Sequence, residues 1–237
     1  SNSNTQIGLS SNGTIEIPSF TAINTSNSVL SSTVTVSPTA NGCVGPDSSF
    51  QFIVNPTPTI SNNLLSDTLC SGDLSNEVIW SSNAVGTTYS WTGIVISGSL
   101  TGVNLSGTGN LPQMNLVNSG TSPAVLVYTV TPEFNGCFGQ AVTYTFVVNP
   151  VPTLSPITSQ DICGGIAFTT PAFLSSVSNT TYSWSLDQPS AVPSTLTGYP
   201  VNGVGDLQGQ IINNSGSVAY TLNYSILPNA AGCVGVV

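Results

Sequence analysis

The sequence predicts an all-β chain of tandem β-sandwich repeats that form an elongated array. Three observations predict this fold: short motifs recur at a fixed spacing, apolar and polar side chains alternate along several segments, and Gly and Pro recur too often for long helices. Because 39% of the residues are apolar and follow a regular pattern, we expect an ordered core in spite of the many Ser, Thr and Asn residues.

The repeats are defined by motifs that return in the same order. Asn55-Pro56-Thr57-Pro58-Thr59-Ile60 returns as Asn149-Pro150-Val151-Pro152-Thr153-Leu154, an offset of 94 residues. Thr87-Thr88-Tyr89-Ser90-Trp91 returns unchanged at 180–184, and Asn41-Gly42-Cys43-Val44-Gly45 returns at 135–139 and, loosely, at 231–235. A repeat of this length with several short strands is typical of an immunoglobulin-like sandwich. The phase predicts the C-terminal part of a truncated repeat over 1–54, a complete Ig-like repeat over 55–148, and an Ig-like repeat without its last strand over 149–237.

Strands are predicted from alternation and composition. Val142, Tyr144, Phe146 and Val148 alternate with three intervening residues, which is the pattern of a half-buried strand. The β-branched and aromatic residues of 126–131 predict a second strand. Asn135-Gly136 lies between the two segments and predicts a hairpin.

The charge inventory excludes several functions. The 237 residues contain no Lys, Arg or His and nine carboxylates, so the formal net charge is -9. Without cations the chain cannot neutralise phosphates, so we expect no nucleic-acid partner. No apolar run is long enough to cross a bilayer, so we expect no membrane span.

The five cysteines are explained by the repeat phase. We predict one disulfide within each repeat, Cys70–Cys137 and Cys163–Cys233, and a partner for Cys43 that lies before residue 1. Each bridge would close a loop of roughly 70 residues and contribute roughly 4 kcal/mol in the chain-entropy model. This regular spacing favours an oxidising, extracellular compartment over a cytosolic protein with reduced thiols.

Catalysis is not expected. Without His, no Ser-His-Asp or Cys-His arrangement can form, and the carboxylates are too thinly spread for a two-carboxylate glycosidase. We expect no cofactor and no metal, with a weak calcium site that uses Asp67 or Asp161 left as an alternative. Trp91 and Trp184, with Tyr89 and Tyr182 on the same predicted strands, are interpreted as core residues rather than a sugar-stacking surface.

Taken together, the motifs resemble a known family. The order is Cys-x-Gly (Cys70-Ser71-Gly72), then Thr-Tyr-Ser-Trp, then Asn-Gly-Cys-x-Gly, then Val-Val-Asn-Pro-x-Pro. It resembles the PKD-like and Ig-like tandem repeats of giant cell-surface adhesins of Bacteroidota, of which the SprB-like gliding-motility adhesins are an example. The resemblance implies type IX secretion, display as a cell-surface filament, and contact with the outer-membrane secretion and motility machinery. It also makes Thr68, in Asp67-Thr68-Leu69, a candidate for O-glycosylation.

The leading hypothesis for function is therefore a structural shaft segment of a long, secreted cell-surface adhesin. Its ligand, a surface polysaccharide or another extracellular molecule, would bind regions outside residues 1–237. The alternative is a spacer or carbohydrate-binding accessory module of a large secreted hydrolase. The paired prolines Pro56 and Pro58, and Pro150 and Pro152, hold the linkers extended, so we expect the domains to lie end to end in a stiff rod.

Overall fold

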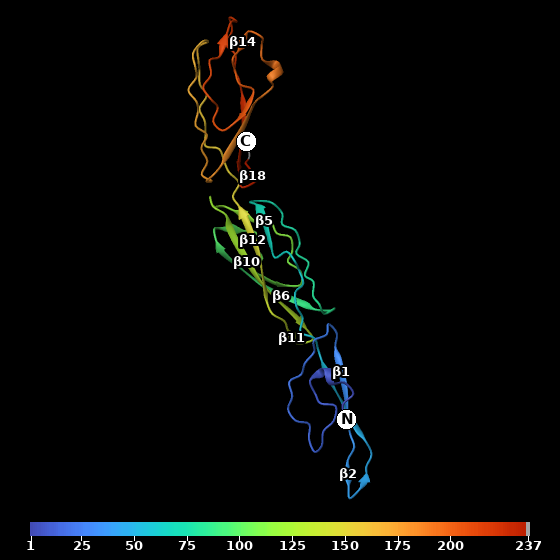
Figure 1. Ribbon diagram of the computed structural model, residues 1–237. Helices are drawn as coiled ribbons and strands as arrows, with labels where there is room; N and C mark the ends of the chain where they lie inside the picture. The colour runs from blue at the N-terminus through green and yellow to red at the C-terminus, as the bar shows by residue number, and fades with distance from the viewer. Residues whose placement is uncertain (236–237) are drawn as a thin grey trace.

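The computed structural model describes residues 1–235 and is nearly all β, as the sequence predicts. Its strands fall into three units that follow one another along one long axis (Figure 1). The first unit contains β1–β4, the second β5–β12 and the third β13–β18. The end-to-end placement agrees with the extended linkers expected from the paired prolines.

The second unit is built on a sheet with the strand order β5-β12-β10-β6-β8. These strands are β5 (Ser66–Cys70), β6 (Thr88–Ser97), β8 (Ser106–Thr108), β10 (Ala124–Phe134) and β12 (Val142–Asn149). β12 pairs antiparallel with β10 and parallel with β5, so that Asn149 lies opposite Cys70. The strands predicted at 126–131 and 142–148, and their antiparallel pairing, are confirmed.

A second layer closes the core of this unit. Val78 and Leu111 each donate a backbone hydrogen bond to the other, at 3.0 and 3.1 Å, and link two extended segments that face the sheet. The short strands β7 (Leu100–Thr101) and β9 (Val117–Asn118) pair at one end, and β11 (Cys137–Phe138) pairs with β10. The fully buried side chains include Leu111, Leu116, Leu126, Tyr128, Val130, Phe146 and Val148. This interior is the largest of the three, because both layers are present.

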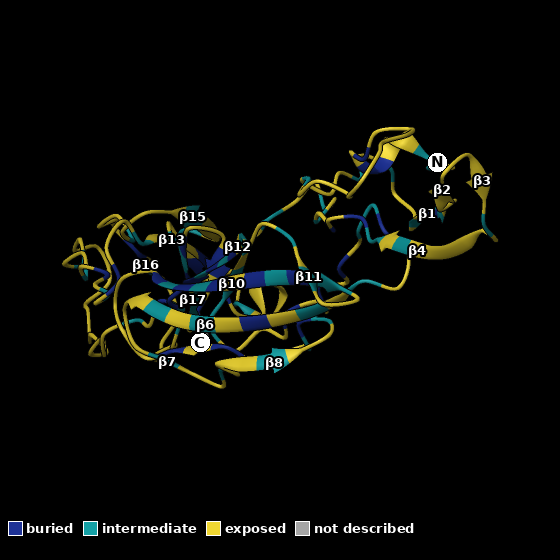
Figure 2. Cartoon of the chain, turned by 90° about the horizontal axis from the view of Figure 1, so that it is seen from below, coloured by how far each residue is buried: buried dark blue, intermediate teal, exposed yellow. Residues whose placement is uncertain are grey.

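The first unit has a much smaller core. β1 (Leu30–Val36) pairs antiparallel with β4 (Ser48–Val54), β2 (Thr39–Ala40) pairs with β3 (Cys43–Val44), and η1 (Thr5–Ile7) contributes Ile7. Among the described residues β4 pairs only with β1, whereas the corresponding β12 has two neighbours. Phe50 and Ile53 on β4 are accordingly exposed, and Figure 2 shows the contrast with the buried β10.

The third unit repeats part of the second. Its main sheet has the order β15-β13-β17-β18, and β14 pairs with β16 beside it. The elements are β13 (Thr181–Leu186), η2 (Pro189–Ala191), β14 (Leu196–Thr197), β15 (Asn202–Val204), β16 (Asn213–Asn214), β17 (Tyr224–Ala230) and β18 (Cys233–Val234). Between Asn149 and Thr181 the structure describes no strand, only the isolated bridge of Ala167 with Ile211.

Candidate functional site

The functional candidates lie where the units meet. Each unit ends its long hairpin in the same tight turn, in which two successive residues take positive φ: Asn41 and Gly42, Asn135 and Gly136, Ala231 and Gly232. In each case the next residue is a cysteine, Cys43, Cys137 or Cys233. A glycine two residues later donates its backbone N–H to a proline carbonyl on the opposite strand, at 2.8–2.9 Å. We call this feature the cysteine hairpin.

The cysteine hairpin packs against the linker that enters its own unit. A Cβ on Gly139 would lie 1.8 Å from the carbonyl oxygen of Pro58, and a Cβ on Gly235 would lie 2.1 Å from that of Pro152. Both prolines are fully buried. The linker prolines therefore restrict φ and also form part of a packed contact, which places the hairpin beside the preceding unit.

The opposite end of the second and third units carries another shared geometry, the cysteine turn. In Cys70-Ser71-Gly72-Asp73 the Asp73 N–H donates to the Cys70 carbonyl at 3.0 Å, and Gly72 donates to Leu116 at 2.9 Å. In Cys163-Gly164-Gly165-Ile166 the same bonds recur, from Ile166 to Cys163 at 3.3 Å and from Gly165 to Ile212 at 2.9 Å. Gly72 and Gly165 both have positive φ, which favours glycine.

One disulfide crosses between units. Cys70, in the turn of the second unit, is bonded to Cys233, in the hairpin of the third, with 5.5 Å between the two Cα atoms. The Cys233 side chain is fully buried. Figure 1 shows β18 beside the ends of β5 and β12, where this bridge joins the two units.

This bridge contradicts the predicted pairings Cys70–Cys137 and Cys163–Cys233. Cys70 lies opposite Asn149 at the last residue of β12, whereas Cys137 precedes Val142 at its start. The eight residues of β12 separate the two cysteines by roughly 23 Å at a rise of about 3.3 Å per residue. A disulfide needs Cα atoms within about 7 Å, so a bridge within the repeat cannot form. Cys43, Cys137 and Cys163 are free thiols in the structure.

The predicted core aromatics are where the sequence places them. Trp91 and Trp184 are buried, and Tyr89 and Tyr182 are half-buried beside them. Trp91 packs edge-on against Tyr128 with 5.5 Å between ring centroids, and Trp184 against Tyr224 at 5.8 Å. Since the ring faces are covered, they are not offered to a sugar.

Tyrosine hydroxyls complete these clusters. Tyr128 donates to the Asn104 carbonyl at 2.6 Å, and Tyr224 donates to the Pro200 carbonyl at 2.7 Å. Burial raises the pKa of Tyr128 to about 12. Burial, and secondarily the nearby Tyr199, raises the pKa of Tyr224 to about 12. Both phenols are therefore neutral hydrogen-bond donors at physiological pH.

The remaining predicted site residues do not gather into one site. Thr68 is exposed on β5, and its backbone N–H donates to the Asp67 carboxylate at 2.8 Å. No group of three or more His, Cys, Asp or Glu side chains suited to a metal occurs within residues 1–235, so Asp67 and Asp161 are not joined in such a cluster. Within the same residues, no helix is long and apolar enough to span a membrane.

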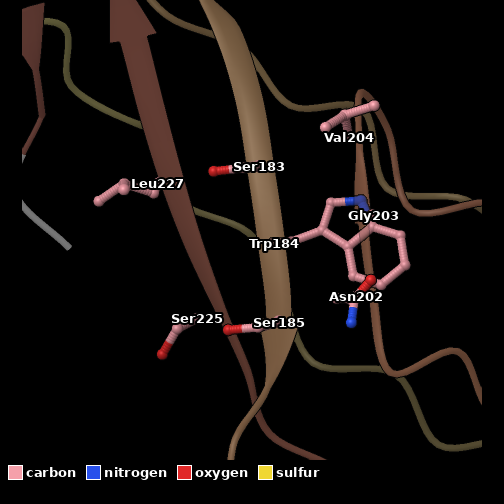
Figure 3. Close-up of a pocket in the computed structure, with 8 residues that line it drawn as sticks. All are labelled: Ser183, Trp184, Ser185, Asn202, Gly203, Val204, Ser225 and Leu227. Atoms are coloured by element: carbon pink, nitrogen blue, oxygen red, sulfur yellow. The ribbon is translucent and has the colours of Figure 1, made fainter.

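The third unit also has a shallow hollow on β13, β15 and β17 (Figure 3). It is lined by Ser183, Trp184, Ser185, Asn202, Gly203, Val204, Ser225 and Leu227. Figure 3 shows the Trp184 ring turned toward Gly203 and the two serines of β13 on the other side of the strand. The hollow thus combines short hydroxyl side chains with the apolar Val204 and Leu227, and no charged residue lines it.

Comparison with known proteins finds a PKD-like domain in the chain: residues 67–152 match the profile of the family described as "PKD-like domain". No curated protein matches. Among solved structures, a protocadherin gammaB7 EC3-6 cis-dimer is similar at 11% identity and a TM-score of 0.34, over 88% of this chain and 59% of that one. Mouse cadherin-23 EC22-24 is similar at 14% identity and a TM-score of 0.30, over 87% of this chain and 72% of that one. The chain spans 59% of the protocadherin chain's length.

Proposed function

We propose that this chain is a structural shaft segment of a long, secreted cell-surface adhesin, which holds a ligand-binding region away from the cell. A PKD-like domain is found in it, and such domains are typically non-catalytic extracellular modules. The order of motifs, which resembles the repeats of gliding-motility adhesins, supports type IX secretion and contact with the outer-membrane motility machinery. The polysaccharide or other ligand binds elsewhere in the filament.

The observation that carries this proposal is the Cys70–Cys233 bridge between units. A disulfide inside one domain stabilises that domain, whereas a disulfide between domains also limits how far the two can separate or bend. Together with the buried contacts of Pro58 with Gly139 and of Pro152 with Gly235, it favours a load-bearing array over freely swinging modules.

The alternative, an accessory module of a secreted hydrolase, finds less support. A carbohydrate-binding module stacks sugars on exposed aromatic faces, and here Trp91 and Trp184 are buried. A spacer in a hydrolase remains the second hypothesis, and the parent chain distinguishes it: a long series of repeats favours the adhesin, and one catalytic domain favours the hydrolase.

Small-angle scattering on the oxidised chain tests the shaft proposal. We expect an elongated particle whose maximum dimension matches three units in line. Pro150→Gly combined with Pro152→Gly and Cys70→Ser should broaden the distance distribution, because both constraints on the second junction are then removed. A compact or widely bending ensemble that these changes leave unaltered would contradict the rod.

A further inference from the structure

We propose that Cys163 is a bonding site for the cysteine hairpin of a unit that follows the third one, so that the Cys70–Cys233 bridge is one instance of a linkage repeated along an array. The first argument is the identity of the two cysteine turns. Cys163 begins a turn with the same pattern of hydrogen bonds as the turn at Cys70. Gly165 donates to the opposite segment in this turn, as Gly72 does in the other. Cys70 is bonded, whereas Cys163 is an exposed thiol.

The second argument is the side-chain amide of Asn214 beside the turn, which makes one fewer hydrogen bond to the described residues than Asn118 does. In the second unit the Asn118 side-chain amide donates to Ser122 O at 2.9 Å and to Val148 O at 2.8 Å, the latter on β12. In the third unit Asn214 donates to Val218 O at 2.9 Å and accepts from Gly216, as Asn118 accepts from Gly120. Among the described residues Asn214 has no acceptor corresponding to Val148.

The third argument is that the segment before Cys163 has no strand partner within residues 1–235. β5 is held as a strand by parallel pairing with β12, from Thr145 opposite Ser66 to Asn149 opposite Cys70. The corresponding segment that leads to Cys163 is not a strand in the structure. A strand equivalent to β12 would pair with this segment, supply the acceptor for Asn214, and lead directly through a linker into the next cysteine hairpin.

The bond forms by exchange with a small disulfide. The Cys163 thiolate attacks oxidised glutathione and releases one glutathione thiol. The hairpin cysteine then attacks the mixed disulfide and releases the second. Two protein thiols are oxidised, one glutathione disulfide is reduced, and the two thiol protons end on the two glutathione molecules.

The test extends the chain in phase by appending a second copy of residues 142–237 directly after Val237, so that the third unit gains its last strand, a linker and a following unit. The extended chain is refolded in a glutathione redox buffer. It is digested with chymotrypsin and mapped without reduction, because trypsin has no site in a sequence without Lys and Arg. We expect two bridges: Cys70–Cys233, and the original Cys163 joined to the appended copy of Cys233.

Cys43 and Cys137 should stay free in this chain. Each is a hairpin cysteine, whose partner would be a cysteine turn in the preceding unit, and the added unit follows them. The matched control is Cys163→Ser in the extended chain, which should leave the appended hairpin cysteine as a free thiol. Hydrogen exchange supplies a readout that is independent of sulfur: amides of residues 159–163 should exchange about tenfold more slowly in the extended chain, with or without Cys163→Ser, as the strand pairs.

A free Cys163 in the extended chain, or a bond from Cys163 to Cys137, would overturn the inference. The inference rests on the proposed function only in requiring tandem units. Failure of the new bridge with a rod-like scattering profile retained would remove the inference and leave the shaft proposal standing. A new bridge together with a compact scattering profile would remove the shaft proposal and leave the inference standing.

Discussion

The indole of Trp91 lies directly against Gly107 on the neighbouring strand, so closely that a Cβ on Gly107 would come within 2.3 Å of the Trp91 ring. Trp184 and Gly203 form the same pair in the third unit, with the same 2.3 Å. In both units the glycine lets the largest core side chain pack between two strands. The two units therefore share this tryptophan–glycine contact as well as the sequence motif that contains the tryptophan.

Gly107→Val should destabilise the second unit by about 1–3 kcal/mol, because the added side chain must displace the Trp91 ring in a close-packed core. Urea unfolding followed by tryptophan fluorescence measures this. Ser106→Ala on the same strand is the control, since Ser106 is exposed and should change the free energy of unfolding by less than about 0.5 kcal/mol. Equal effects from the two variants would show that the close contact is not a constraint.

High pH should destabilise the chain through Tyr128. Its pKa is about 12 in the folded protein and about 10 in the unfolded chain, so the unfolded state loses its proton first. The stabilisation is complete below pH 10 and is lost as the pH rises toward 12. We expect Tyr128 alone to lower the free energy of unfolding of the second unit by roughly 2 kcal/mol between pH 9 and pH 11.5.

Tyr128→Phe is the control for that measurement. It removes the hydrogen bond to the Asn104 carbonyl and should cost about 1 kcal/mol at neutral pH. The pH dependence between 9 and 11.5 should be weaker in this variant. A slope identical to that of the unmodified protein would assign the alkaline effect to other groups.

Gly235→Ala should weaken the Cys70–Cys233 bridge. The added methyl would lie 2.1 Å from the Pro152 carbonyl oxygen, so the hairpin that carries Cys233 must move away from the linker. At a cost of about 1–3 kcal/mol, the equilibrium constant for the bridge in a glutathione redox buffer should fall about fivefold or more. Quantitative thiol alkylation measures the fraction of bonded Cys70.

Gly139→Ala provides the matched control. It creates the same close contact with Pro58 at the first junction, where Cys137 is a free thiol. It should leave the Cys70–Cys233 equilibrium unchanged while loosening the junction between the first two units. A similar loss of the bridge in both variants would mean that the effect is not local to the hairpin.

The fold could be predicted because its signals are local. Alternation over Val142–Val148 identifies a strand, and Asn135-Gly136 identifies the turn, without knowledge of distant neighbours. The cysteine pairing could not be predicted in this way. It depends on the parallel pairing of β5 with β12, which places Cys70 at the opposite end of the unit from Cys137. Parallel pairing joins segments far apart in the sequence, and no periodic pattern of residues indicates which segments will pair.

A signal was nevertheless present in the sequence. Cys70 stands before Ser71-Gly72, and Cys137 follows Asn135-Gly136, so each cysteine adjoins a turn rather than the middle of a strand. The inter-sheet disulfide of an immunoglobulin domain joins residues inside strands. Cysteines beside turns belong to the ends of the unit, where the neighbouring unit is the closest partner.

The central claim is that one disulfide makes the second and third units a single mechanical element, and pulling the chain by its ends tests it most directly. Residues between Cys70 and Cys233, a separation of 163, should be shielded from the force while the bridge is intact. We predict that dithiothreitol, or Cys233→Ser, lengthens the fully extended chain in single-molecule force spectroscopy by roughly 550 Å, at about 3.3–3.6 Å per residue. A contour length that reduction does not change, or one that grows by only the roughly 70 residues of a bridge within one repeat, would contradict the account.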